Sequence, residues 1–190
     1  MNIFVIRHGE TAWSLTGQHT GATDIELTGN GRRLAKRMGE ALSETEFELV
    51  LCSPMLRARE TCELAGLGDQ AVIDADLLEW NYGDYEGLTP NQIHEMAPGW
   101  MLFRDGCPGG ETPAEVGARV DRVIARFHAV EGNVAVFAHG HILRTLAARW
   151  IGLPTSGARH FLLDPCTLSI LGYYHREFPA VRIWNGPLGN

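Results

Sequence analysis

Short apolar runs alternate along this chain with longer segments of helical periodicity, and this alternation is the feature that most limits its fold. Four apolar runs occupy residues 2–7, 47–52, 71–77 and 133–138, and a final pair of strand-like segments occupies 167–174 and 180–185. Strands separated by amphipathic helices form largely parallel sheets with helices on both faces. The sequence therefore predicts an α/β fold, a three-layer α/β/α sandwich around a mostly parallel sheet.

The expected helices have recognisable starts. Four residues that commonly cap helices precede them: Thr28, Ser53, Thr89 and Thr112. After Thr89 and Thr112, a Gln or Glu three residues later completes a capping box. After Ser53, Pro54 occupies the first expected helical position. Residues 104–113 are rich in Gly and Pro but too short for a domain linker, so we expect one domain spanning residues 1–190.

Composition excludes several classes of partner. The chain has 190 residues and a formal net charge of −7, which disfavours nucleic acid and anionic membranes as partners. The four cysteines form no CxxC pair, and no signal peptide or membrane-spanning run is present, so we expect a cytoplasmic protein without disulfides. A homo-oligomer is compatible with the sequence, because the strand at 167–174 could lie at a sheet edge and pair with a second chain.

Polar residues follow three of the apolar runs. The first run ends in "RHGET", the second continues into "SPMLR" and the fourth ends in "AHGH". The carboxyl ends of parallel strands meet at one edge of a sheet, where ligands bind. We therefore expect five side chains to lie together there: Arg7, His8, Arg57, His139 and His141. Arginines and imidazoles near helix N-termini suit a phosphate group.

This grouping indicates a reaction at phosphorus. A neutral imidazole is a nucleophile, and nearby arginines would keep His8 neutral while stabilising the transferring phosphoryl group. The leaving alkoxide needs a proton, and Glu79, which follows an apolar stretch beside Trp80, is the preferred donor. Asp84 and Glu86 compete with it, although either could be a solvated loop charge.

Five motifs in order, "RHGET", "SPMLRARET", "LLEWNYGDYEG", "GGET" and "FAHGH", resemble the histidine phosphatase superfamily. The resemblance implies the phosphoglycerate mutase-like fold, with His8 as the phosphorylated nucleophile and Glu79 as proton donor. It also implies that Arg7, Arg57 and His139 form the phosphate pocket. Water would then attack the phosphohistidine, with Glu79 as base. Neither a metal nor another cofactor is expected.

Within that family, the chain resembles the phosphatases rather than the mutases, because only about sixty residues separate Glu79 from His139. It is most similar to sedoheptulose-1,7-bisphosphatase-type members. The resemblance implies a set of substrate-binding residues: Ser14, His19, Thr20, Gly21, Ser53, Tyr82, His141 and Arg144. Ser14 replaces an asparagine of the mutases, and His19 replaces a tyrosine of the bisphosphatases, so the sugar stays open.

We expect a small anionic phosphorylated substrate, either a sugar phosphate or a bisphosphate. Arg104 and Arg144 are candidates for a second anion site, which a bisphosphate requires. The alternatives are phosphoglycerate mutase-type phosphoryl transfer and a broad-specificity phosphomonoesterase. Two further alternatives are a metallohydrolase, with the H-x-H pair and His8 or Glu10 as ligands, and a binding module without activity.

Overall fold

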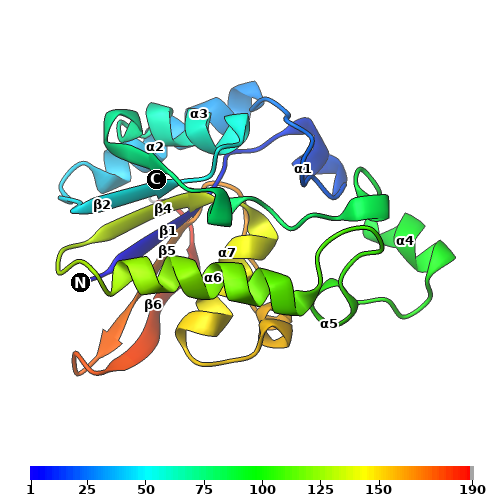
Figure 1. Cartoon of the computed structure of the whole chain (residues 1–190). Coiled ribbons are helices and arrows are strands. Elements are labelled where there is room, and N and C mark those ends of the chain that lie inside the picture. Colours follow the sequence, from blue (N-terminus) through cyan, green and yellow to red (C-terminus); the bar gives the residue numbers. More distant parts are fainter. Residues whose placement is uncertain (189–190) are drawn as a thin grey trace.

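The computed structural model describes residues 1–188, which include a six-stranded sheet with the order β3-β2-β4-β1-β5-β6 (Figure 1). The strands are β1 (Ile3–Arg7), β2 (Leu49–Cys52), β3 (Ala71–Ile73), β4 (Val134–Ala138), β5 (Leu168–Tyr174) and β6 (Phe178–Gly186). Strands β3, β2, β4 and β1 are parallel, whereas β5 and β6 are antiparallel to their neighbours. The predicted mostly parallel sheet is confirmed.

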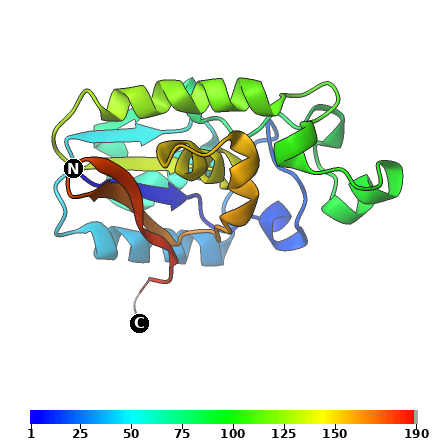
Figure 2. The same cartoon turned by 90° about the horizontal axis from the view of Figure 1, so that it is seen from below.

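Helices cover both faces of this sheet. They are α1 (Ala12–Thr16), α2 (Gly29–Leu42), α3 (Leu56–Leu64), α4 (Pro90–Met96), α5 (Leu102–Asp105), α6 (Pro113–Phe127) and α7 (Gly140–Trp150). Helices α2 and α3 lie on one face, and α6 and α7 lie on the other (Figure 1). The segment with α4 and α5 extends beyond the carboxyl ends of β1 and β4 (Figure 2). The three-layer α/β/α sandwich is therefore confirmed.

The central strand β4 shows why the chain adopts three layers. All five of its residues are buried, and their side chains alternate between two hydrophobic clusters. Val134 and Val136 pack with residues of α6 and α7, whereas Ala135 and Phe137 pack with residues of α2 and α3. A strand buried on both faces needs this continuous apolar run. The apolar run ends before His139, as expected, so a polar side chain lies at the edge of the core.

The predicted caps are confirmed at three helices and wrong at one. Thr28, Thr89 and Thr112 cap α2, α4 and α6 through their side chains. Helix α3 instead begins at Leu56, because the backbone of Ser53 continues the sheet by donating to the Phe137 carbonyl. The Leu56 amide is satisfied by Asp24 Oδ1 at 2.9 Å, from a distant loop. The Ser53 hydroxyl is therefore available for another partner.

The predicted edge position of the segment 167–174 is also wrong. Strand β5 pairs with β1 on one side and β6 on the other, so its backbone groups are used within the sheet. Among the described strands, the edges of the sheet are β3 and β6.

The Gly/Pro-rich segment 104–113 packs against the segment that follows Glu79. Gly83 has a φ of +51°, and a Cβ there would lie 2.2 Å from the Pro108 carbonyl oxygen. Only glycine permits this close approach. The Asp84 amide donates to the Pro108 carbonyl oxygen and the Glu111 amide donates to the Asn81 carbonyl oxygen, each at 2.9 Å, so the segment between α5 and α6 is held backbone to backbone against the segment that precedes α4.

All four cysteines are free thiols, and all four are buried. Within residues 1–188, none of the helices has both the length and the apolar character that a membrane span requires.

We expect Phe137→Ala to lower the free energy of unfolding by about 3–5 kcal/mol, because the side chain is fully buried in the central strand. Val72→Ala is the matched control on the edge strand β3, where the side chain is 45% exposed, and its cost should stay below about 1 kcal/mol. Denaturant unfolding measures both values. Equal losses would contradict the described core.

Candidate active site

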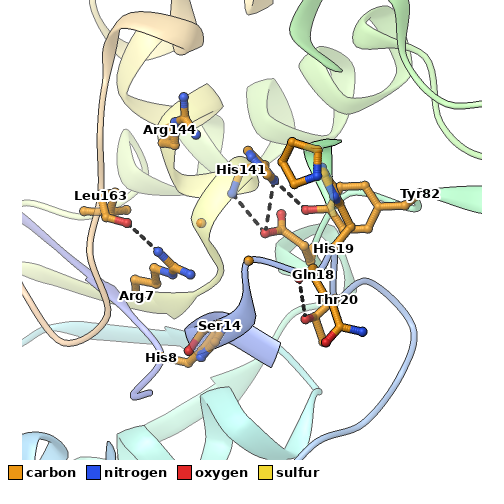
Figure 3. Close-up of a pocket in the computed structure, with 14 residues that line it drawn as sticks. Arg7, His8, Ser14, Gln18, His19, Thr20, Tyr82, His141, Arg144 and Leu163 are labelled. Carbon is orange, nitrogen blue, oxygen red and sulfur yellow. Dashed lines mark hydrogen bonds and ion pairs between the residues drawn. The ribbon is translucent and has the colours of Figure 1, made fainter. Parts of the chain in front are cut away.

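Polar residues at the carboxyl ends of β1 and β4 line a cavity of about 240 Å³ at this edge of the sheet (Figure 3). Nine predicted site residues line this cavity: Arg7, His8, Ser14, His19, Thr20, Glu79, Tyr82, His141 and Arg144. The backbone and side chains of Gly17, Gln18, Pro90, Gly140 and Leu163 complete the wall. Nine of the fourteen predicted site residues therefore line one cavity.

His8 presents one free ring nitrogen to the cavity. Its Nδ1 lies 2.8 Å from the Gly9 carbonyl oxygen, and because a carbonyl can only accept, Nδ1 carries the proton. This leaves the lone pair on Nε2. Burial, followed by the positive charges of Arg7 and Arg57, holds the pKa of His8 well below its ordinary value. The imidazole is therefore neutral near pH 7 and competent as a nucleophile.

Arg7 supplies an incompletely satisfied positive charge beside His8. Its Nη1 donates to the Leu163 carbonyl oxygen at 2.6 Å, whereas its buried Nε has no hydrogen-bond partner within residues 1–188. An unpaired buried donor on a charged group is costly unless a ligand satisfies it. The Arg7 guanidinium can therefore receive an anion at the cavity.

Arg57 lies behind the cavity rather than on its surface. The side chain is fully buried, and its Nη atoms donate to the carbonyl oxygens of Thr20, Gly21 and Thr23 at 2.9–3.0 Å. These contacts hold the loop that follows Gln18 against α3. Gly21 likewise lies behind the wall, although the sequence had placed it in the substrate site.

His139 connects Arg57 to His8. Its Nδ1 accepts a hydrogen bond from Arg57 Nε at 3.1 Å, so its proton resides on Nε2, which lies 2.7 Å from Ser53 Oγ. Burial, with the charge of Arg57 second, holds the pKa of His139 well below its ordinary value. Its ring centroid is 5.2 Å from that of His8. Ser53, His139 and Arg57 thus form a hydrogen-bonded chain, and the His139 ring lies next to His8.

Glu79 also lines the cavity. Its side chain is only 5% exposed, and its carboxylate accepts hydrogen bonds from the amides of Trp80, His141 and Ile142, each at 2.9 Å. The last two amides belong to the first turn of α7, where the helix dipole favours negative charge. These contacts fix the position of the carboxylate beside the cavity.

Tyr82, His141 and His19 form the neighbouring wall. The Tyr82 hydroxyl lies 2.5 Å from His141 Nδ1, and burial raises the pKa of Tyr82 well above its ordinary value, so the hydroxyl donates. Burial, with Arg144 second, holds the pKa of His141 well below its ordinary value. The rings of His19 and His141 stack 5.7 Å apart. These neutral groups offer hydrogen bonds rather than charge to a substrate.

The two arginines predicted to hold a second anion lie in different places. Arg144 lines the cavity with its guanidinium 4.7 Å from the Phe103 ring centroid. Arg104 does not reach the cavity: its side chain is 55% exposed and donates through Nε and Nη2 to Asp105. The prediction for Arg104 is wrong, because the single turn of α5 places its guanidinium beside Asp105 on the outer surface.

Three further residues have roles that the sequence did not indicate. The Glu86 carboxylate accepts from the amides of Gly21 and Thr23, so it is not a free loop charge. Asp24 Oδ1 lies 4.0 Å from Arg57 Nη1 and also caps α3. Gln18 donates to the Gly87 carbonyl oxygen while lining the cavity. These contacts join segments more than thirty positions apart, so no local pattern reveals them.

The Ser14 hydroxyl is already engaged, because it donates to the Thr11 carbonyl and accepts from the Thr11 amide in a capping box. Within the described chain, no three His, Cys, Asp or Glu side chains are grouped as metal ligands would be. Both ring nitrogens of His139 are hydrogen-bonded, which leaves neither one for the H-x-H metal site considered from the sequence.

Comparisons with known proteins agree with this geometry. The sequence model of the histidine phosphatase superfamily (branch 1) matches residues 3–186. An acid phosphatase of Mycobacterium tuberculosis is 41% identical over 177 residues, covering 91% of this chain and 87% of the relative. The sedoheptulose 1,7-bisphosphatase of Saccharomyces cerevisiae is 40% identical over 181 residues, covering 78% of this chain and 67% of the relative.

Solved structures show the same similarity. The product of an open reading frame of Mycobacterium tuberculosis superposes with a TM-score of 0.93 at 38% identity, covering 99% of this chain and 98% of that one. A mycobacterial glucosyl-3-phosphoglycerate phosphatase in complex with VO3 has a TM-score of 0.86 at 28% identity, covering 98% of this chain and 99% of that one.

The buried neutral imidazoles predict a pH dependence of stability. Below the unfolded-state pKa of about 6.5, the unfolded chain binds protons that folded His8 and His139 exclude, so the free energy of unfolding should fall as the pH is lowered from 7 to 5. Chemical denaturation at each pH measures this free energy of unfolding. In His8→Asn, which lacks a titrating ring, the decline should be shallower, whereas the exposed control His160→Asn should match the wild type. An unchanged slope in His8→Asn would contradict the neutral assignment.

Proposed function

This chain belongs to the histidine phosphatase superfamily and is a phosphoric monoester hydrolase, and we propose that it hydrolyses a small sugar phosphate through a phosphohistidine. One observation carries the proposal: a neutral His8, whose Nδ1 is engaged by the Gly9 carbonyl oxygen, lines the same cavity as Arg7, whose Nε has no hydrogen-bond partner within residues 1–188. A nucleophile and a cation so placed suit attack on a phosphate dianion.

The proposed reaction has two steps. His8 Nε2 attacks phosphorus, forming the N–P bond while the P–O bond to the sugar breaks. The negative charge of the bound phosphate favours the protonated form of the neighbouring Glu79 carboxyl group, which gives its proton to the leaving oxygen. In the second step Glu79 takes a proton from water, whose oxygen attacks the phosphohistidine and releases inorganic phosphate. The Arg7 guanidinium stabilises the phosphoryl oxygens in both steps.

We propose further that the preferred substrate is a sugar bisphosphate, similar to sedoheptulose 1,7-bisphosphate. Arg144 lines the same cavity as His8, and no carboxylate within residues 1–188 forms an ion pair with it. Its guanidinium is available for a second phosphate while the first lies at Arg7. The name of the yeast relative, a sedoheptulose 1,7-bisphosphatase, supports this substrate class.

A broad-specificity phosphomonoesterase is the second candidate. The 41% identical relative is an acid phosphatase, a name that specifies no sugar. In that case Arg144 would contact solvent or a carboxylate of varied substrates rather than a defined second phosphate. In both cases, the proposed enzyme acts in the cytoplasm on a small anionic molecule.

Rapid quenching with a sugar phosphate carrying labelled phosphorus tests the intermediate. We expect acid-labile label on the wild-type protein in the presence of a chelator, because the proposed mechanism uses no metal. His8→Ala should carry no label and should lose activity by on the order of a thousand-fold or more, since it lacks the nucleophile. His160→Ala, which changes an exposed histidine, is the control. Label retained in His8→Ala would exclude His8 as the nucleophile.

Arg144→Ala distinguishes the two substrate classes. Loss of a charged hydrogen bond to a second phosphate should lower kcat/KM for a sugar bisphosphate by about 10- to 100-fold, with less than about a threefold change for the matching monophosphate. Steady-state kinetics with both substrates measure the ratio. Arg104→Ala, outside the cavity, should change neither. Equal losses on both substrates in Arg144→Ala would refute the second anion site and favour the broad-specificity enzyme.

A further inference from the structure

Arg119 and Glu111 form a largely buried ion pair beside the proposed proton donor. The Arg119 side chain is 13% exposed and that of Glu111 is 21% exposed, and the contact is bidentate. Arg119 Nε donates to Glu111 Oε1 at 2.8 Å, and Arg119 Nη2 donates to Oε2 at 2.9 Å. A planar guanidinium paired in this way has a fixed orientation. Its remaining N–H groups therefore point in defined directions.

Those remaining groups hold the chain just before Glu79. Arg119 Nη1 donates to the carbonyl oxygen of Asp76 at 2.7 Å and to that of Leu78 at 2.8 Å. Arg119 Nη2 also lies 3.4 Å from the carbonyl oxygen of Glu79 itself. One side chain of α6 thus binds three carbonyl groups of the segment that leads to the carboxylate.

Glu111 holds the chain just after Glu79. Its Oε2 accepts from the Asn81 amide at 2.9 Å, and its backbone amide donates to the Asn81 carbonyl at 2.9 Å. Its carbonyl oxygen also accepts from Trp80 Nε1 at 2.9 Å. The ion pair therefore binds the backbone on both sides of the proposed proton donor.

The segment around Glu79 needs such support, because it belongs to no strand or helix. The 3₁₀ turn before it ends at Leu77, and the next begins at Gly83, so no sheet ladder fixes residues 78–82. A neighbouring ion pair between α6 and this region, Arg122–Asp76, behaves differently. Arg122, which is 59% exposed, binds the side chain of Asp76 and no carbonyl near Glu79.

We propose that the Arg119–Glu111 ion pair is a positioning device that sets the Glu79 carboxyl group at proton-transfer distance from the leaving oxygen. This rests on the proposed role of Glu79 as proton donor. Neither residue lines the cavity, so both act through the backbone of residues 78–81. General acid catalysis needs the donor within hydrogen-bond reach, and small displacements lower the rate strongly.

The test compares two leaving groups. Nitrophenolate departs from p-nitrophenyl phosphate with little need of a proton, whereas the alkoxide of glycerol 2-phosphate needs one. We expect Arg119→Lys and Glu111→Gln each to lower kcat/KM, which covers only the steps up to departure of the leaving group, by about tenfold or more for glycerol 2-phosphate and by less than about threefold for p-nitrophenyl phosphate. Arg122→Lys, on the same helix, should change neither. Glu79→Gln, measured in parallel, shows how large the difference is when the donor itself is lost.

The outcomes separate the two proposals. If Glu79→Gln lowers kcat/KM equally for both substrates, the proton-donor role fails, and the positioning role fails with it. If Glu79→Gln discriminates between the substrates but Arg119→Lys and Glu111→Gln do not, only the positioning role is overturned. A thermal melt of each variant identifies loss of fold, which would lower both activities together. If Arg119→Lys fails to fold, Glu111→Gln alone decides, because it keeps the arginine in place.

Discussion

Two buried guanidinium groups at the carboxyl edge of the sheet determine how the rest of this site is built. An unpaired charge in the protein interior is so costly that the surrounding chain must supply acceptors. For Arg57 these are the carbonyl oxygens of residues 20, 21 and 23, so the loop after α1 must fold against α3. Glu86 and Asp24 then hold that loop in place. One buried arginine therefore holds the loop that contributes Thr20 to the cavity wall.

Arg7 differs from Arg57 in a way that gives the site its function. Arg57 is satisfied by protein atoms, whereas the Nε of Arg7 has no partner within residues 1–188. The same two charges, together with burial, keep His8 uncharged. The structure thus holds a neutral nucleophile next to an incompletely hydrogen-bonded cation. A phosphate bound between them would interact with both groups.

The sequence predicted the features that follow from local patterns and missed those made by distant contacts. His8 and His139 were predictable because each directly follows a buried parallel strand, and Arg7 because it is the last residue of one. The cap at Ser53 was wrong because Asp24, some thirty positions earlier, satisfies α3 instead. Arg104 was wrong because its neighbour Asp105 binds it on the outer surface. The roles of Glu86, Glu111 and Arg119 depend on which loops meet, and no residue pattern along the chain specifies that.

The nucleophile and the proposed proton donor are held by different kinds of structure. His8 directly follows β1, whose ladder with β4 fixes the backbone up to Arg7, and the His8 amide itself donates to the Ala138 carbonyl. Glu79 lies in an irregular segment held by side chains of α6 and by amides of α7. Attack on phosphorus therefore depends on the strand β1 and its ladder, whereas protonation of the leaving group depends on the contacts of the segment around Glu79. Because the sheet and the irregular segment are held by different contacts, substitutions that displace the donor can leave the nucleophile in place, and the two catalytic contributions can be separated by the choice of leaving group.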